Sequence, residues 1–318
     1  MRVASNSYTR VEDHTSPSVN ERIRARTGGE VGYYAEHPEE IDRRLEELDR
    51  EWDIERWLQF NSAALTFAGL GLGLFHNKKW FALPIAVQLF FMQHGVQGWC
   101  PPLPAFRRMG VRTAREIEAE RNALRALRGD FDIKQDDPSA AIRAALDNGS
   151  ATSDEEGFIT PTRRRVRNHT PESFNATIDH HTRRRVAYYA RHPERAYQRL
   201  KALEKEWDIE RVIEVHGPTL TLGAIAAGMV GRPIGLRFAM LVQSMMMLHA
   251  IKGFYPPLPM FRKLGLRTFD EIAAERTAIL LALGELRFED DDTEEHDEKH
   301  SQRDRAAQNT LDASLAEI

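Results

Sequence analysis

Few side chains in this 318-residue sequence could do chemistry, and the most distinctive lie in long apolar runs. Gln88 and Gln243 occupy the middle of two such runs, and His94 and His249 follow them six residues later. Imidazole and amide groups inside apolar helices can form a proton or solute pathway, but they also hydrogen-bond between helices. Because a six-residue step turns about 240° around a helix, Gln and His do not share one face. We expect a structural role in the bundle interior, with a pathway as the alternative.

The single cysteine, Cys100, lies just before a proline run. An exposed thiol near Arg107 and Arg108 would gain thiolate character, so Cys100 is a candidate reactive thiol. One cysteine excludes an intramolecular disulfide and a Cys-rich metal site. No phosphate-binding glycine loop, HExxH motif or nucleophile elbow occurs, and interleaved aromatics for nucleic-acid stacking are missing. We therefore expect no enzymatic activity, no metal, no cofactor and no nucleic-acid partner.

These residues belong to one long segment that the chain contains twice without a gap. Residues 33–131 and 188–286 align at a constant offset of 155, and Glu-Trp-Asp-Ile-Glu-Arg stands unchanged at 51–56 and 206–211. Because solenoid periods run to roughly 20–50 residues, a period this long indicates a domain duplication. The pattern predicts an intrachain pseudo-dimer, and homo-oligomers of the whole chain stay open.

Each copy contains two long apolar runs that predict a helical hairpin. The four runs are 57–75, 80–100, 212–230 and 234–255. A membrane-spanning helix needs about 20 predominantly apolar residues, so each run is just long enough. We predict hairpins at about 57–100 and 212–255. The first turns of two runs are polar, which leaves the buried hairpin of a soluble protein as an alternative.

Basic residues gather outside the hairpins and are fewer in their connections. The first connection carries Lys78 and Lys79, whereas the outer flanks are rich in arginine. The positive-inside rule then places the termini and the linker in the cytoplasm. This predicts a multi-pass protein of the cytoplasmic (inner) membrane. Besides the lipid bilayer, anionic lipid headgroups are candidate partners for the arginine triplets at 163–165 and 183–185.

Polar segments flank and separate the two copies. Residues 1–32 are predicted to be a disordered N-terminal arm, 132–187 a polar linker and 287–318 a charged disordered tail. Within each copy, an amphipathic cytoplasmic helix precedes the hairpin and another follows it, as the apolar stripe from Ile41 to Leu48 indicates. The predicted fold is all-α, with two tandem transmembrane hairpins, four spanning helices in all.

Capping signals mark where several of these helices begin. Asp53 and Asp208 are predicted N-caps of the first helix of each hairpin. Thr113 with Glu116, and Thr268 with Glu271, match the capping-box pattern that opens the final helix of each copy.

Small residues recur one turn apart within the first helix of each hairpin. They are Gly69 and Gly73 in the first copy, and Ala224 and Gly228 in the second. Small residues let helix backbones approach closely, so this pattern predicts a compact four-helix bundle. Ordinary helix composition is the alternative interpretation.

With these residues in view, each copy resembles the YgaP-like transmembrane domain, a two-helix inner-membrane domain of unknown function. The resemblance rests on Asp53 to Arg56, on Gly98-Trp99-Cys100-Pro101 and on Met109-Gly110-Val111-Arg112, each with a second-copy counterpart. It implies two spanning helices with cytoplasmic ends and a tendency to form homodimers, so the chain looks like a fused dimer. No rhodanese domain is recognisable, and the family's Gly-Phe-Cys-Pro cysteine survives only as Cys100. Sulfur transfer is therefore not implied.

The sequence thus favours a non-enzymatic membrane-embedded structural or interaction protein, whose cytoplasmic helices recruit a protein partner that it does not identify. One alternative is transport of a small solute or ion through the four-helix bundle. A second alternative is a soluble tandem helical binding protein.

Overall fold

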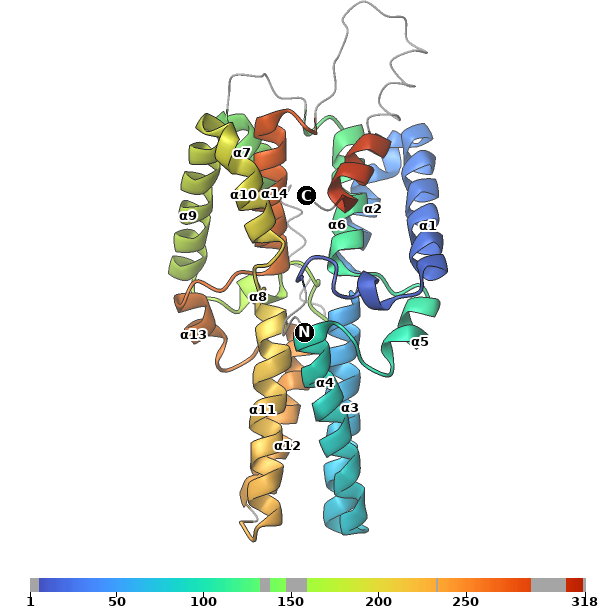
Figure 1. Ribbon diagram of the computed structural model, residues 1–318, viewed down its shortest axis with the longest axis vertical. Coiled ribbons are helices and arrows are strands. Elements are labelled where there is room, and N and C mark those ends of the chain that lie inside the picture. Colours follow the sequence, from blue (N-terminus) through green and yellow to red (C-terminus); the bar gives the residue numbers. More distant parts are fainter. Residues whose placement is uncertain (1–5, 132–137, 147–158, 233, 287–306, 317–318) are drawn as a thin grey trace, which may run out of the picture.

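The computed structural model describes residues 6–131, 138–146, 159–232, 234–286 and 307–316, and every regular element within them is a helix. The predicted all-α class is therefore correct. Figure 1 shows a broad head of helices at one end of the molecule and a narrow stem at the other. Most of the predicted charged tail and part of the predicted linker fall outside the described residues. Where the tail is described, the prediction of disorder is wrong, because residues 307–315 are helical and bury Ala307 and Leu311.

The stem is formed by two helical hairpins that pack together as a four-helix bundle. Its helices are α3 (Ile54–Phe75), α4 (Ala82–Gln97), α11 (Ile209–Met229) and α12 (Ile234–Lys252). The 3-10 helix η3 (Lys78–Phe81) lies in the turn of the first hairpin. Each long helix contacts its hairpin partner and one helix of the other hairpin, α3 with α12 and α4 with α11.

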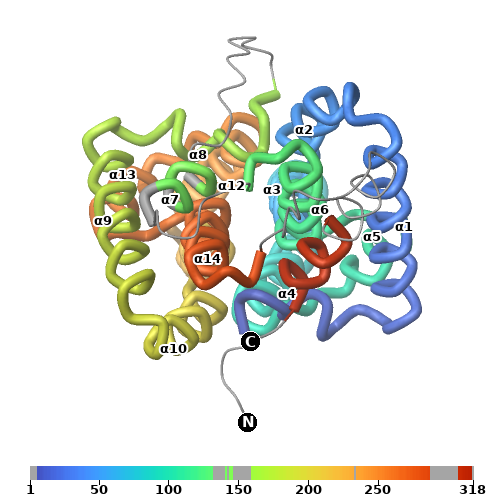
Figure 2. Tube along the Cα trace, turned by 90° about the horizontal axis from the view of Figure 1, so that it is seen from above, coloured from blue at the N-terminus to red at the C-terminus, as the bar shows by residue number. Residues whose placement is uncertain are grey.

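The head contains two equivalent groups of helices, which Figure 2 shows side by side when viewed from above. The first group is α1 (Pro17–Glu36), η2 (Pro38–Glu40), α2 (Ile41–Arg50) and α6 (Ala114–Leu127). The second group is α9 (Glu172–Arg191), α10 (Pro193–Leu203) and α14 (Phe269–Leu283), with α7 (Pro138–Leu146) packed against it. Short helices join head to stem: η1 (Glu12–His14), α5 (Leu103–Arg108), α8 (Arg165–Asn168) and α13 (Leu258–Lys263).

Equivalent positions of the two halves meet each other, which marks a pseudo-twofold axis along the molecule. In the stem, the side chains of Gln88 and Gln243 approach to 3.3 Å. In the head, Asn122 and Thr277 do the same at 3.3 Å. Both pairs are separated by 155 residues, the offset of the sequence repeat.

The prediction of a disordered arm over 1–32 is wrong from Pro17 onward, because α1 begins there. Its buried side chains Val19, Ile23, Thr27 and Val31 recur every four residues and give the helix one inward face, which packs on α6. The predicted polar linker 132–187 ends too late, because α9 of the second head group begins at Glu172.

The structural repeat therefore begins earlier than the aligned segment suggests. Arg10-Val11 and His14-Thr15 return as Arg165-Val166 and His169-Thr170 at the same offset, just before α1 and α9. Helix α1 is polar apart from its narrow buried stripe, which is why composition alone indicates disorder.

The predicted capping residues all cap helices. Asp53 accepts a hydrogen bond from the backbone N–H of Arg56 at 2.8 Å, and Asp208 accepts one from Arg211 at 2.8 Å. Both predicted capping boxes form, at the starts of α6 and α14. These caps satisfy backbone donors that a helix start leaves unpaired.

The small residues of the stem lie where helices of the same hairpin touch. A Cβ atom on Gly69 would stand 2.7 Å from Pro84, and one on Gly73 would overlap the ring of Phe81. In the second hairpin, Gly228 lies against Leu236, and the carbonyl oxygen of Ala224 lies against Gly235. The structure thus places all four residues at close contacts within their hairpins.

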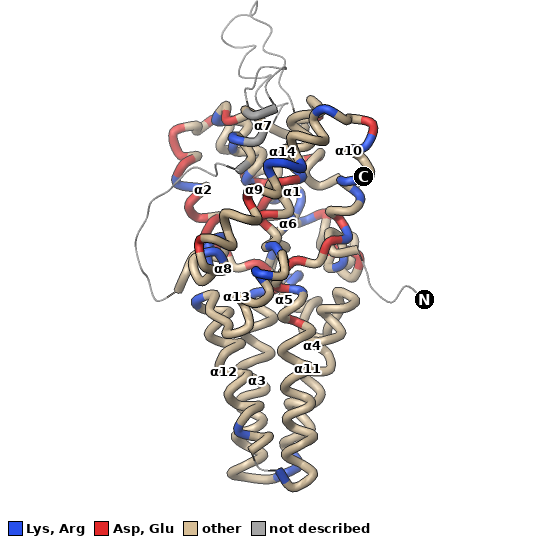
Figure 3. Tube along the Cα trace, turned by 90° about the vertical axis from the view of Figure 1, so that its left-hand side faces the viewer, with Lys and Arg blue, Asp and Glu red and all other residues tan. Residues whose placement is uncertain are grey.

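The outer surface of the stem is apolar, whereas charge is concentrated in the head. Figure 3 shows acidic and basic residues throughout the head and few of them along the stem. Exposed stem side chains include Leu65, Phe67, Phe75, Leu89, Phe238 and Leu241. Two segments are long and apolar enough to cross a membrane, α12 and the run Pro38–Phe75, which ends in α3.

Candidate functional site: the polar junction between head and stem

A buried layer of charged side chains lies where the stem meets the head. The first junction cluster consists of Arg10, Glu55, His94 and Glu214. Arg10 donates to Glu55 at 2.8 Å and to Glu214 at 3.1 Å. The Nε2 atom of His94 lies 2.7 Å from the other carboxylate oxygen of Glu55. Arg10, His94 and Glu214 are almost fully buried, so these contacts form away from bulk water.

The second junction cluster repeats this arrangement in the other half, with Arg165, Glu210, His249 and Gln59. Arg165 and Glu210 form an ion pair at 2.9 Å, and His249 lies 2.9 Å from Glu210. Gln59 donates its side-chain N–H to Glu210 at 2.7 Å. Each cluster takes three residues from one repeat and one from the other, so the layer joins the two halves.

Glu55 is the central acceptor of the first cluster. One of its carboxylate oxygens accepts from the guanidinium of Arg10, and the other lies at hydrogen-bond distance from the ring of His94.

Arg56 and Arg211, the crossing arginines, bind the helix ends of the opposite repeat. Arg56 donates to the carbonyl of Ala250 at 2.6 Å and to that of Ile251 at 3.0 Å, at the end of α12. Arg211 donates to Gly95 at 2.8 Å and to Val96 at 3.0 Å, at the end of α4. The last carbonyls of a helix have no partner within it and carry partial negative charge, so each guanidinium stabilises the other hairpin.

The remaining residues of the repeated Glu-Trp-Asp-Ile-Glu-Arg motif support this junction. Glu51 makes a two-pronged ion pair with Arg112, at 2.8 and 2.6 Å. The ring of Trp52 covers the guanidinium of Arg56, whose central carbon lies 4.3 Å from the ring centre. Ile54 is fully buried in the core beneath them. The motif is therefore explained by packing and hydrogen bonding at the head–stem boundary.

The four polar residues singled out in the sequence are all buried in the bundle. Gln88 donates to Thr66 at 2.7 Å, and Gln243 donates to Thr221 at 2.6 Å. His94 and His249 lie in the junction clusters, away from the glutamines. Sequence reasoning missed that each histidine pairs with a glutamate 39 residues before it.

Ligand-type side chains come together in the first cluster, which the sequence analysis did not anticipate. One atom each from Glu55, His94 and Glu214 lies within 4.8 Å of the others. Carboxylate and imidazole groups are common metal ligands. However, the guanidinium of Arg10 already binds both carboxylates and would repel a metal cation in the same space. The donor set therefore fits a divalent metal poorly.

Cys100, the candidate reactive thiol, is buried. Only 2% of its surface is exposed, and its counterpart Tyr255 is equally buried. The side chain belongs to the apolar core at the end of the stem that adjoins the head. Reactivity requires an accessible thiolate, so Cys100 is a packing residue.

We therefore expect Cys100 to resist a water-soluble alkylating reagent in the folded protein and to react fully after denaturation, as mass spectrometry would measure. Rapid modification of the folded chain would show that this part of the core opens readily.

Two arginines of the triplet at 163–165 form ion pairs within the protein. Arg163 forms an ion pair with Glu118 at 2.7 Å, and Arg165 lies in the second junction cluster. Both side chains are mostly buried, so they are not available to lipid headgroups as the sequence suggested. In the second triplet, Arg185 pairs with Glu275 at 2.9 Å.

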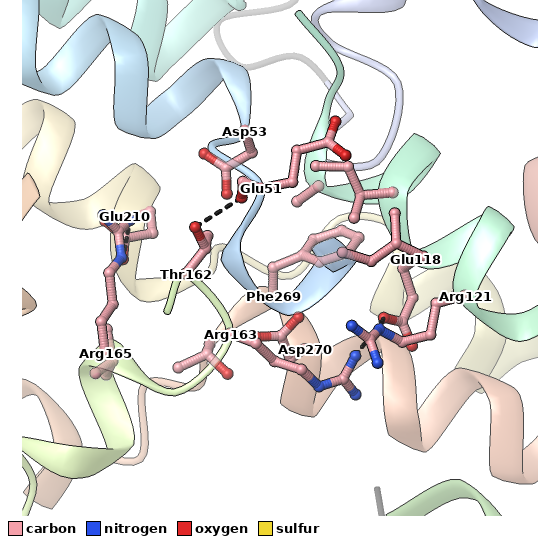
Figure 4. Close-up of a pocket in the computed structure, with 15 residues that line it drawn as sticks. Glu51, Asp53, Glu118, Arg121, Thr162, Arg163, Arg165, Glu210, Phe269 and Asp270 are labelled. Atoms are coloured by element: carbon pink, nitrogen blue, oxygen red, sulfur yellow. Dashed lines mark hydrogen bonds and ion pairs between the residues drawn. The ribbon is translucent and has the colours of Figure 1, made fainter. Parts of the chain in front are cut away.

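A small charged cavity lies between the two halves of the head (Figure 4). Its polar lining residues are Glu51, Asp53, Glu118, Arg121, Thr162, Arg163, Arg165, Glu210, Thr268 and Asp270. The hydroxyl of Thr162 donates to the carbonyl of Glu51 at 2.7 Å across one side. The volume of about 50 Å³ is far below the roughly 300–1,000 Å³ of typical ligand pockets. This space suits a few water molecules.

No family model, curated protein or solved structure matches this chain. The resemblance to the YgaP-like domain therefore rests on the motifs in the sequence, and the function has to be argued from the site itself.

Proposed function

We propose that this chain is an integral membrane protein whose four stem helices all span the bilayer. The observation that carries this proposal is the apolar outer surface of the stem beneath a charged head (Figure 3). Contiguous apolar surface is unfavourable in water and favourable against lipid tails. The exposed Phe67, Leu89, Phe238 and Leu241 come from three different stem helices and support a lipid contact around the bundle.

The dimensions of the stem fit this proposal. At about 1.5 Å per residue, the 22 residues of α3 reach about 33 Å, near the roughly 30 Å of a bilayer core. Helix α4 has 16 residues and reaches about 24 Å, with η3 extending the same hairpin. The two hairpins would insert together, because the crossing arginines and the glutamine pair join them.

The positive-inside rule supports a cytoplasmic head in the inner membrane, since arginine is concentrated there. This orientation agrees with the resemblance to the YgaP-like domain, and the chain would be the fused equivalent of its homodimer. Tryptophans Trp57 and Trp80 are exposed near the two ends of the first hairpin, where aromatic side chains favour the membrane interface.

We propose a non-enzymatic scaffold whose head recruits a protein partner. The polar groups inside the stem support this role, because they bind one another: Gln88 with Thr66 and Gln243, and Gln243 with Thr221. The transport alternative draws on the same polar groups, which lie along the bundle from the glutamines to the buried histidines.

Liposome experiments separate these two functions. If the protein is a scaffold, imposed proton and potassium gradients across sealed liposomes that contain it should remain unchanged. The double variant Gln88→Leu/Gln243→Leu should behave like the wild type and should remain folded. Protein-dependent flux that this double substitution abolishes would contradict the scaffold and establish the pathway.

A further inference from the structure

The two junction clusters differ at one position, and this difference changes their charge. Gln59 of the second cluster corresponds to Glu214 of the first, at the offset of 155. The other members are the same: Arg10 and Arg165, Glu55 and Glu210, His94 and His249. With neutral histidines, the second cluster contains one positive and one negative charge. An ionised Glu214 would leave the first cluster with one uncompensated negative charge.

The surroundings of Glu214 make such a charge unfavourable. Its side chain is fully buried, and its Oε1 atom has no hydrogen-bond partner among the described residues. The backbone of α4 closes over it, since a Cβ atom on Gly95 would stand 3.0 Å from the Cβ of Glu214. A buried carboxylate without full compensation is costly, and such groups usually bind a proton instead.

We infer that Glu214 is a proton-binding site: its carboxyl group is protonated at neutral pH and donates a hydrogen bond to Glu55. The acid O–H would then do what the N–H of Gln59 does in the second cluster, where it donates to Glu210 at 2.7 Å. Glu55 is the natural acceptor, because its carboxylate group already accepts from Arg10 and lies against the ring of His94. This inference is independent of the proposed scaffold function.

The other groups around Glu214 agree with one bound proton. Glu55 faces it from α3, His94 from α4 and Arg10 from the N-terminal segment, while Asp208 and Arg211 act from its own helix. Arg10 is the cation that directly contacts Glu214, and it is shared with Glu55. One proton on Glu214 gives the first cluster the same net charge as the second, and no side chain has to move.

The substitution Glu214→Gln tests the inference through the pH dependence of stability. Between the ordinary pKa of glutamate and the pH at which folded Glu214 ionises, the unfolded chain releases this proton and the folded chain keeps it. Wild-type stability therefore falls as pH rises through that range, and the variant lacks this contribution. Over that range, we expect the unfolding equilibrium constant of the wild type to rise about tenfold per pH unit relative to that of the variant.

An ionised Glu214 paired with Arg10 predicts instead that the stability difference between the wild type and Glu214→Gln does not change with pH above the ordinary pKa of glutamate. That result would overturn the inference. Gln59→Glu is the matched variant, because it should install a second such proton and steepen the loss of stability with rising pH.

Infrared spectroscopy of the wild-type protein provides a test that needs no variant to fold. A carboxylic-acid C=O band from glutamate should persist at neutral pH and should shift on exchange into deuterium oxide. Absence of that band would overturn the inference. A second outcome would also overturn the inference: one tightly bound metal ion per chain, whose removal by a chelator lowers the melting temperature. The metal would then supply the missing positive charge.

Discussion

Replacing Arg56 by methionine is expected to lower the free energy of unfolding by about 3–5 kcal/mol, because three backbone carbonyls at the junction lose a charged donor. These acceptors are the carbonyls of Ala250, Ile251 and Thr160, and the Arg56 side chain is fully buried. Since a typical protein is stable by about 5–15 kcal/mol, such a loss threatens the whole fold. Unfolding in detergent, followed by circular dichroism, measures it.

The pseudo-twofold axis supplies a replicate, since Arg211→Met should have a similar effect. Arg43→Ala is the control: Arg43 also makes two ion pairs, with Glu40 and Glu47, but on the exposed surface of α2. Solvent-exposed pairs contribute little, so this variant should unfold like the wild type. Equal effects of Arg43→Ala and Arg56→Met would show that the crossing contacts do not hold the hairpins together.

Replacing Gly98 by alanine is expected to cost about 3 kcal/mol or more, from backbone strain and overpacking together. Gly98 ends α4 with a φ of 84°, a left-handed conformation that L side chains rarely adopt. A Cβ atom there would stand 2.7 Å from the carbonyl carbon of Arg10, so Arg10 would have to leave the first junction cluster. The melting temperature of the variant measures the combined effect.

Gly110→Ala separates the two causes, because Gly110 has a similar φ of 87°, but the nearest described atom beyond its chain neighbours, in the side chain of Arg26, lies 3.7 Å from the added carbon. It should lose only the strain contribution, about 1–2 kcal/mol. If both alanine variants lose the same stability, the contact between Gly98 and the Arg10 backbone has no energetic role.

Much of the fold could be predicted from local patterns. The hairpins, the N-caps at Asp53 and Asp208 and both capping boxes depend on residues close in sequence, where composition and spacing are informative. Helix α1 was missed because its inward face consists of single residues such as Val19 and Ile23 among polar neighbours. Comparison at the repeat offset would have found it, since Arg10 and Thr15 return as Arg165 and Thr170.

The junction clusters could not be predicted in the same way, because their contacts join distant parts of the chain. Arg10 meets Glu214 across 204 residues, and Arg56 meets Ala250 across 194. The sequence shows Gln59 and Glu214 as polar residues in the first turns of two apolar runs. Only the folded arrangement shows that each faces the glutamate of the opposite repeat.

The central claim is that the stem spans a membrane, and fractionation of the expressed protein tests it most directly. Membranes would be washed with alkaline carbonate, which releases peripheral proteins, and then extracted with detergent. Our account predicts that the protein stays in the carbonate-washed membranes and is released only by detergent. Release by carbonate, or recovery in the cytosol, would contradict it and leave a soluble helical protein with an exposed apolar stem.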